Sequence, residues 1–89
     1  MIKRQIDIIN KLGLHARAAA KFVTLAAQYE SDIQLVGNNR KVNGKSIMGV
    51  MMLAAGQGTR LDLVADGNDE NAATDALEGL VKSRFGEKE

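Results

Sequence analysis

The chain has 89 residues, and its 12 Lys and Arg against 11 Asp and Glu give a net charge of only +1. The basic residues form no block and there are only one Tyr and two Phe, so we do not expect a nucleic-acid partner. With no Cys and a single His, no disulfide, metal site or cofactor is expected. No run approaches the roughly 18 apolar residues of a membrane span, so we expect one cytoplasmic domain over residues 1–89, without membrane insertion.

The first elements of the chain are predicted to be a strand and a helix. Apolar and polar residues alternate from Ile2 to Ile8, which is typical of a strand with one buried face. From Ala16 the apolar residues recur at helical spacing. The predicted helix ends near Tyr29 or Glu30.

A hairpin and a short helix are expected next. Residues 32–36 and 40–42 flank the segment Gly37-Asn38-Asn39, whose residues tolerate positive φ, and this pattern predicts a β-hairpin. Ser46 is a suitable N-cap for a short helix from Ile47 to about Leu53.

The last part of the chain repeats the strand and helix patterns. Alternation over residues 59–65 predicts a strand, and the apolar spacing from Ala73 to Val81 predicts a helix that frays into residues 86–89. The element order is βαββαβα. We therefore predict an α+β fold, a two-layer open-faced β-sandwich in which a four-stranded antiparallel sheet carries three helices on one face.

The single histidine, His15, directly precedes the first predicted helix. A lone histidine is most often a surface or capping residue, but a helix N-terminus presents free N–H groups and a partial positive charge that attract anions. Arg17 adds a cation suited to phosphate, and the backbone N–H groups of Ala16 and Ala18 lie in the first turn. This positive environment favours a neutral ring, so His15 is a candidate nucleophile for phosphoryl transfer and Arg17 a candidate for charge stabilisation.

Nothing else in the chain resembles a catalytic set, which favours a carrier that partner enzymes load and unload. An acylphosphatase-like enzyme is an alternative with a similar element order, although Asn10-Lys11-Leu12-Gly13 makes a poor phosphate-binding loop. An RNA-binding domain of similar topology is a further alternative, against which the missing strand aromatics argue.

Two segments resemble the HPr family, the histidine-containing phosphocarriers of the bacterial phosphoenolpyruvate:sugar phosphotransferase system. GLHARAAA, from Gly13 to Ala20, is similar to the segment around the phosphorylated histidine, and VNGKSIMGVMMLAAGQGT, from Val42 to Thr59, is similar to the segment around a regulatory serine. The resemblance covers essentially the whole chain. The family commonly has proline after the arginine, whereas this chain has Ala18.

The resemblance implies a set of partners and roles. Enzyme I would phosphorylate His15 on Nδ1, Enzyme IIA domains would receive the phosphoryl group, and an HPr kinase/phosphorylase would act on Ser46. A nitrogen-regulatory paralogue with the same chemistry is the alternative within the family, and the Ser46 segment favours the sugar branch. A monomer is expected.

The short helix after Ser46 is expected to divide its apolar residues between the core and the surface. Val50 and Leu53 suffice to anchor it, which leaves Ile47, Met48 and Met51 as an exposed patch suited to several partners. The resemblance implies that this patch meets partner proteins together with the start of the first helix, at Ala16 and Ala20. Met52 is left without a role.

Overall fold

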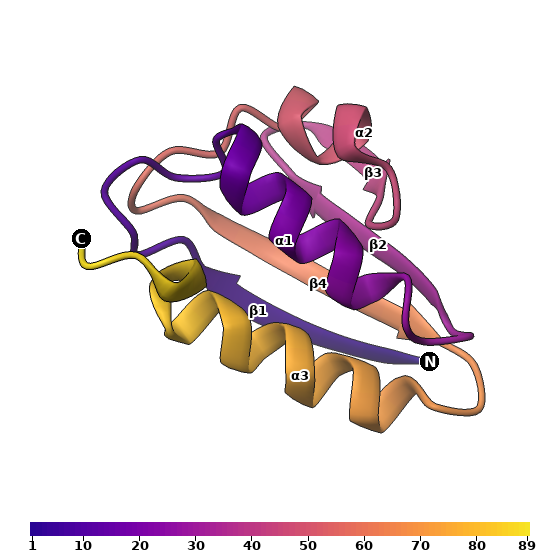
Figure 1. Cartoon of the computed structure of the whole chain (residues 1–89). Helices are drawn as coiled ribbons and strands as arrows, with labels where there is room; N and C mark the ends of the chain where they lie inside the picture. The colour runs from indigo at the N-terminus through magenta and orange to yellow at the C-terminus, as the bar shows by residue number, and fades with distance from the viewer.

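Four strands form one antiparallel sheet in the order β1-β4-β2-β3 in the computed structural model, which describes residues 1–89 (Figure 1). Three helices cover one face of this sheet, so the predicted α+β sandwich and the order βαββαβα are confirmed. None of the helices has the length and apolarity needed to cross a membrane. The elements are β1 (Ile2–Asp7), α1 (Ala16–Ala26), β2 (Asp32–Gly37), β3 (Arg40–Asn43), α2 (Ile47–Met52), β4 (Arg60–Asp66), α3 (Glu70–Lys82) and a short 3-10 helix, η1 (Arg84–Gly86).

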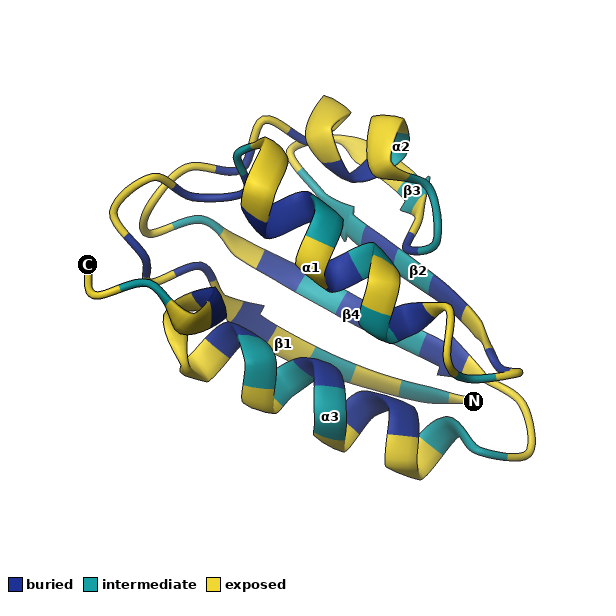
Figure 2. Cartoon of the chain, in the orientation of Figure 1, coloured by how far each residue is buried: buried dark blue, intermediate teal, exposed yellow.

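The inner strand β4 joins the two halves of the sheet. It pairs antiparallel with β1 on one side, where Ile6 lies opposite Leu61, and with β2 on the other, where Leu35 lies opposite Leu63. These four side chains are almost fully buried because they point toward the helices, whereas the alternate residues along each strand are more exposed (Figure 2). The helices complete the core with Ala18, Ala19, Phe22 and Ala26 from α1 and with Ala73, Leu77 and Val81 from α3.

The predicted hairpin and the predicted cap are both present. Asn38 and Asn39 have φ of 49° and 63°, as a two-residue turn between twisted strands requires. The side chain of Ser46 caps α2, because its Oγ accepts a hydrogen bond of 3.1 Å from the N–H of Gly49. Helix α2 ends at Met52, one residue earlier than predicted.

Helix α1 is one turn shorter than predicted, since it ends at Ala26 and not near Tyr29 or Glu30. The N–H groups of Gln28 and Tyr29 bond to carbonyls three residues back, which tightens the chain and turns it toward β2. The apolar spacing continued through Tyr29 because this side chain still packs against the core from the turn. Spacing alone did not show where the hydrogen-bond pattern changes.

The prediction that the chain frays after α3 is wrong. Phe85 is fully buried, and the backbone of Arg84, Phe85 and Gly86 turns through φ of 58°, 55° and 77° to place it there. The ammonium group of Lys21 on α1 also donates a hydrogen bond of 2.6 Å to the carbonyl of Phe85. A single apolar residue outside the helical spacing is a weak sequence signal, so this anchor was missed.

The anchoring of the C-terminal segment leads to a stability prediction. Phe85→Ala is expected to lower the free energy of unfolding by about 3–5 kcal/mol, because it removes a fully buried aromatic ring. Urea denaturation measures this. Leu12→Ala is the control: Leu12 is an apolar residue that is 66% exposed, so the change should stay within about 0.5 kcal/mol. Equal stability of the Phe85 variant and wild type would contradict the anchor.

Candidate functional site

His15 occupies the N-cap position of helix α1. Its backbone is extended, with φ of −70° and ψ of 176°, and its carbonyl accepts the first helical hydrogen bond, 2.8 Å from the N–H of Ala19. The N–H groups of the three residues between His15 and Ala19, which are Ala16, Arg17 and Ala18, donate no hydrogen bond. Ala16 and Arg17 are exposed, so their N–H groups are open to an incoming anion, whereas Ala18 is fully buried.

The turn before His15 is fixed by close packing of two loops. Gly13 has φ of 65°, and a Cβ atom at this position would lie 2.4 Å from the carbonyl oxygen of Ala55. Glycine therefore permits the loop after β1 to press against the loop before β4. The N–H of Leu14 bonds to the same carbonyl at 2.9 Å. The backbone just before His15 is thus held against the loop that precedes β4.

One ring nitrogen of His15 contacts a carboxylate from the other end of the chain. Nε2 lies in hydrogen-bond contact with Oε2 of Glu87, and the two side chains are only 26% and 15% exposed. Nδ1 forms no hydrogen bond with the protein. Sequence reasoning missed Glu87 because it lies in the polar segment that was expected to fray.

Glu87 is itself held as an anion. The amide of Asn10 donates a hydrogen bond of 2.9 Å to Oε1 of Glu87. This hydrogen bond is the largest of the influences that lower the pKa of Glu87 below its ordinary value of 4.5, and the contact with His15 and the charge of Lys21 act in the same direction. A carboxylate whose pKa is lowered by folding stabilises the fold above its ordinary pKa, and this contribution is lost as the pH falls through the lowered value.

Arg17 supplies an uncommitted positive charge at the site. Its guanidinium forms no ion pair and no hydrogen bond with another side chain. Arg17 lines a shallow groove between the loop after β1 and the C-terminal segment. The other residues that line this groove are Lys11, Leu12, Glu87, Lys88 and Glu89. The structure therefore places this cation next to the carboxylate that contacts His15, where it is free to meet a phosphate.

The predicted docking residues lie on α2 and on the first two turns of α1. Helix α2 packs against α1 close to the end that carries His15 (Figure 1). Val50 and Leu53 are buried and anchor α2. The other apolar side chains Ile47, Met48 and Met51, which we call the α2 patch, are 40–70% exposed. Ala16 is exposed and Ala20 is half-buried on α1. Met52, which was left without a role, is also exposed.

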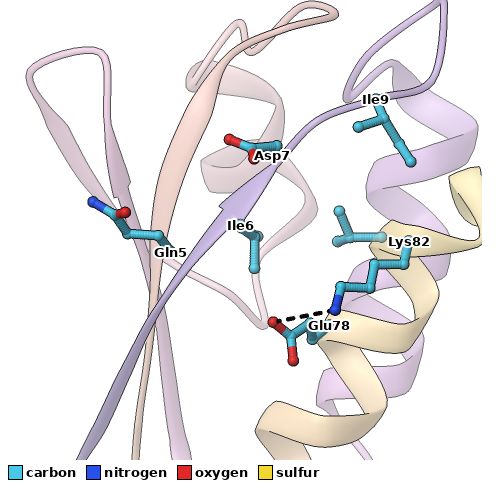
Figure 3. A pocket seen from close by; sticks show the side chains of 7 residues that line it. Gln5, Ile6, Asp7, Ile9, Glu78 and Lys82 are labelled. Carbon is cyan, nitrogen blue, oxygen red and sulfur yellow. Dashed lines mark ion pairs between the residues drawn. The ribbon is translucent and has the colours of Figure 1, made fainter.

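A cavity of about 190 Å³ lies away from these residues, between β1 and α3 (Figure 3). Glu78 and Lys82 form an ion pair of 3.9 Å at its wall. None of the predicted site residues lines it. No cluster of three His, Cys, Asp or Glu side chains is placed to hold a metal ion.

Known proteins match this chain over its full length. A family model described as the PTS HPr component phosphorylation site matches residues 2–83. Phosphocarrier protein HPr of Neisseria meningitidis is 54% identical, with 100% of both chains covered, and phosphocarrier protein NPr of Shewanella violacea is 42% identical, covering 97% of this chain and 94% of the relative.

Solved structures agree with the sequence matches. The crystal structure of HPr-C-His from Thermoanaerobacter tengcongensis has a TM-score of 0.96 at 48% identity, with 100% of both chains covered. A crystal structure of an HPr dimer from the same organism has a TM-score of 0.78 at 49% identity, covering 98% of this chain and all of that one. The chain is a phosphocarrier and not an enzyme, which removes the acylphosphatase-like alternative, and it belongs to the HPr family of the phosphotransferase system.

Proposed function

We propose that His15 accepts a phosphoryl group from phosphorylated Enzyme I and passes it to Enzyme IIA domains. The observation that carries this proposal is the ring of His15 at a helix N-terminus, with Nε2 held by Glu87 and Nδ1 without a partner. A nitrogen that keeps its lone pair and lies beside free N–H groups has what phosphoryl transfer needs. This chemistry would take place in the cytoplasm, where phosphoenolpyruvate is formed.

The groups around the ring have separate roles in the proposed transfer. Nδ1 attacks phosphorus in line with the departing donor, and the phosphoryl oxygens receive hydrogen bonds from the N–H groups of Ala16 and Arg17. The Arg17 guanidinium approaches the same oxygens and stabilises the charge that spreads over them in the transition state. The N–H of Ala18 belongs to the same turn, but its burial makes it the least accessible of the three.

The α2 patch and the start of α1 are the proposed docking surface for these partners. Exposed methionines suit a carrier that meets several proteins, because their unbranched side chains adapt to different surfaces. Ala16 and Ala20 extend this surface toward His15. We propose that the chain acts as a monomer, since docking uses the face that carries both α1 and α2.

A nitrogen-regulatory carrier is the second candidate within the family, and the similarity to NPr of Shewanella violacea favours keeping it. The transfer chemistry at His15 would be the same, and only the partners would differ. The capping position of Ser46 next to the α2 patch supports the sugar branch, in which an HPr kinase/phosphorylase would modify this serine.

His15→Ala tests the proposed acceptor. The variant is expected to fold as wild type does but to take up no phosphate from Enzyme I and phosphoenolpyruvate, because the nucleophilic nitrogen is gone. Phosphorus NMR of the purified protein measures the acid-labile phosphohistidine. Phosphorylation of the variant at the wild-type rate would overturn the assignment of His15.

Arg17→Ala tests the proposed charge stabilisation. Since the guanidinium acts on charge that develops in the transition state, its loss is expected to slow transfer by on the order of 10- to 100-fold. Stability should be nearly unchanged, because the side chain is exposed and unpaired. Rapid-quench kinetics with phosphorylated Enzyme I gives the rate, and Lys82→Ala on α3 is the control for loss of a surface cation. Equal rates for the Arg17 variant and wild type would leave this residue without a role in transfer.

Ser46→Asp tests the regulatory role of the serine. Aspartate still caps α2, so the variant should melt no earlier than wild type. The added charge beside the α2 patch is expected to raise the apparent KM of Enzyme I for this protein by about tenfold, because desolvation and repulsion oppose docking. Ser46→Asn keeps the cap without the charge and serves as the control. An unchanged KM would leave Ser46 as a cap alone and favour the nitrogen-regulatory branch.

A further inference from the structure

Asn10 and His15 from the loop after β1 form a continuous hydrogen-bonded chain with Glu87 from the C-terminal segment. Asn10 donates to Oε1 of Glu87, and Oε2 of Glu87 contacts Nε2 of His15. Asn10 is fully buried, and the two other side chains are mostly buried. Both oxygens of the Glu87 carboxylate thus have a partner, one the amide of Asn10 and the other the ring of His15.

The amide of Asn10 has only one orientation that fits its surroundings. Its Nδ2 donates to the carbonyl of Gly13 at 2.8 Å and to Glu87 at 2.9 Å, and both of these partners only accept hydrogen bonds. A flipped amide would turn its oxygen toward two acceptors. The orientation that serves Glu87 leaves Oδ1 of Asn10 buried without any partner, which a stability role alone would not favour.

The segment that carries Glu87 is fixed on both sides of it. Before Glu87, Phe85 is buried in the core and its carbonyl accepts a hydrogen bond from Lys21. After Glu87, a backbone oxygen of Glu89 accepts a hydrogen bond from the N–H of Lys11. The carboxylate is therefore held in place by its own backbone and does not depend on the contact with His15.

We propose that Glu87, oriented by Asn10, is a positioning residue that keeps the proton of the neutral His15 ring on Nε2 and leaves Nδ1 as the nitrogen with a lone pair. This inference rests on the proposed role of His15 in phosphoryl transfer. A carboxylate oxygen accepts hydrogen bonds only, so the nitrogen that faces it must be the one that carries hydrogen. Because His15 caps α1, the nitrogen that is free to react belongs to the residue directly before the unpaired N–H groups of Ala16 and Arg17.

The carboxylate also balances the charge of the phosphorylated ring. In the transfer step the lone pair of Nδ1 forms the new N–P bond, while the bond from phosphorus to the donor breaks and its electron pair stays with the donor. The proton remains on Nε2, so the ring gains positive charge as the new bond forms. Glu87 meets that charge at Nε2, and the same contact opposes a change of tautomer between one transfer and the next.

Glu87→Gln is a sharp test, because glutamine has nearly the same shape but only one oxygen. Asn10 and His15 contact different oxygens of Glu87, so the single oxygen of glutamine can take only one of these two places. When the glutamine oxygen accepts from Asn10, the NH₂ group faces Nε2. An NH₂ group donates hydrogen bonds, so it favours the ring that has its hydrogen on Nδ1 and a lone pair on Nε2. Nitrogen-15 NMR of the neutral ring reads the tautomer directly. We expect hydrogen on Nε2 in wild type and a substantial fraction on Nδ1 in the variant.

Transfer kinetics provide the second measurement. Glu87→Gln is expected to lower the maximal rate of transfer from phosphorylated Enzyme I by on the order of tenfold, with an unchanged apparent KM, since Glu87 is not on the α2 patch. Glu30→Gln is the control for the loss of a glutamate charge, because Glu30 is exposed beyond the end of α1 that lies opposite His15 and only its backbone N–H forms a hydrogen bond. It should retain the wild-type tautomer and rate.

The outcomes separate this inference from the proposed function. Hydrogen on Nδ1 in the neutral ring of wild type would overturn the role of Glu87, and this measurement needs no variant. Wild-type tautomer and rate in Glu87→Gln, or an equal loss in Glu30→Gln, would overturn it as well. A wild-type protein that takes up no phosphate, yet shows hydrogen on Nε2, would instead refute the carrier role of His15 and leave the ring-positioning contact intact.

Discussion

Burial of one face of the sheet under α1 and α3 is the constraint on which the rest of the structure depends. The strands alternate, so a shift of pairing by one residue would turn every buried side chain to the solvent. Leu35 and Leu63 at the centre fix that register, and the helices must then lie at defined positions above them. Helix α1 adds Phe22 and the buried alanines Ala18, Ala19 and Ala26 to this core, and the start of the helix is thereby fixed in space.

The site follows from where α1 begins. Helix α1 buries Ala18 and Ala19 of its first turn but leaves Ala16 and Arg17 exposed, so the unpaired N–H groups next to His15 lie at the molecular surface. The same end of the molecule receives the C-terminal segment, which folds back from α3 and lies near the loop after β1 (Figure 1). Rigid backbone on one side and an anchored carboxylate on the other leave the imidazole little freedom to rotate.

Local patterns in the sequence were sufficient for most of the fold and for the position of His15 directly before α1. Alternation, helical spacing, the Asn38-Asn39 turn and the Ser46 cap each act over a few residues, so each could be recognised in isolation. The contact between His15 and Glu87 joins residues 72 positions apart. No local pattern encodes it, because Glu87 lies in a charged segment and its anchor is the single residue Phe85. The early end of α1 was missed for a related reason, since Tyr29 remains in the core after the helix has stopped.

The long sequence separation between His15 and Glu87 also orders events during folding. Contacts within a helix or a hairpin form early, whereas contacts between the two ends of a chain must wait for the intervening loops to close. The helix with His15 at its cap can therefore form before its carboxylate partner arrives. A nascent or partly opened molecule would present the histidine with its ring free to exchange tautomers, and a phosphate acceptor of fixed geometry would exist only once the last segment has docked.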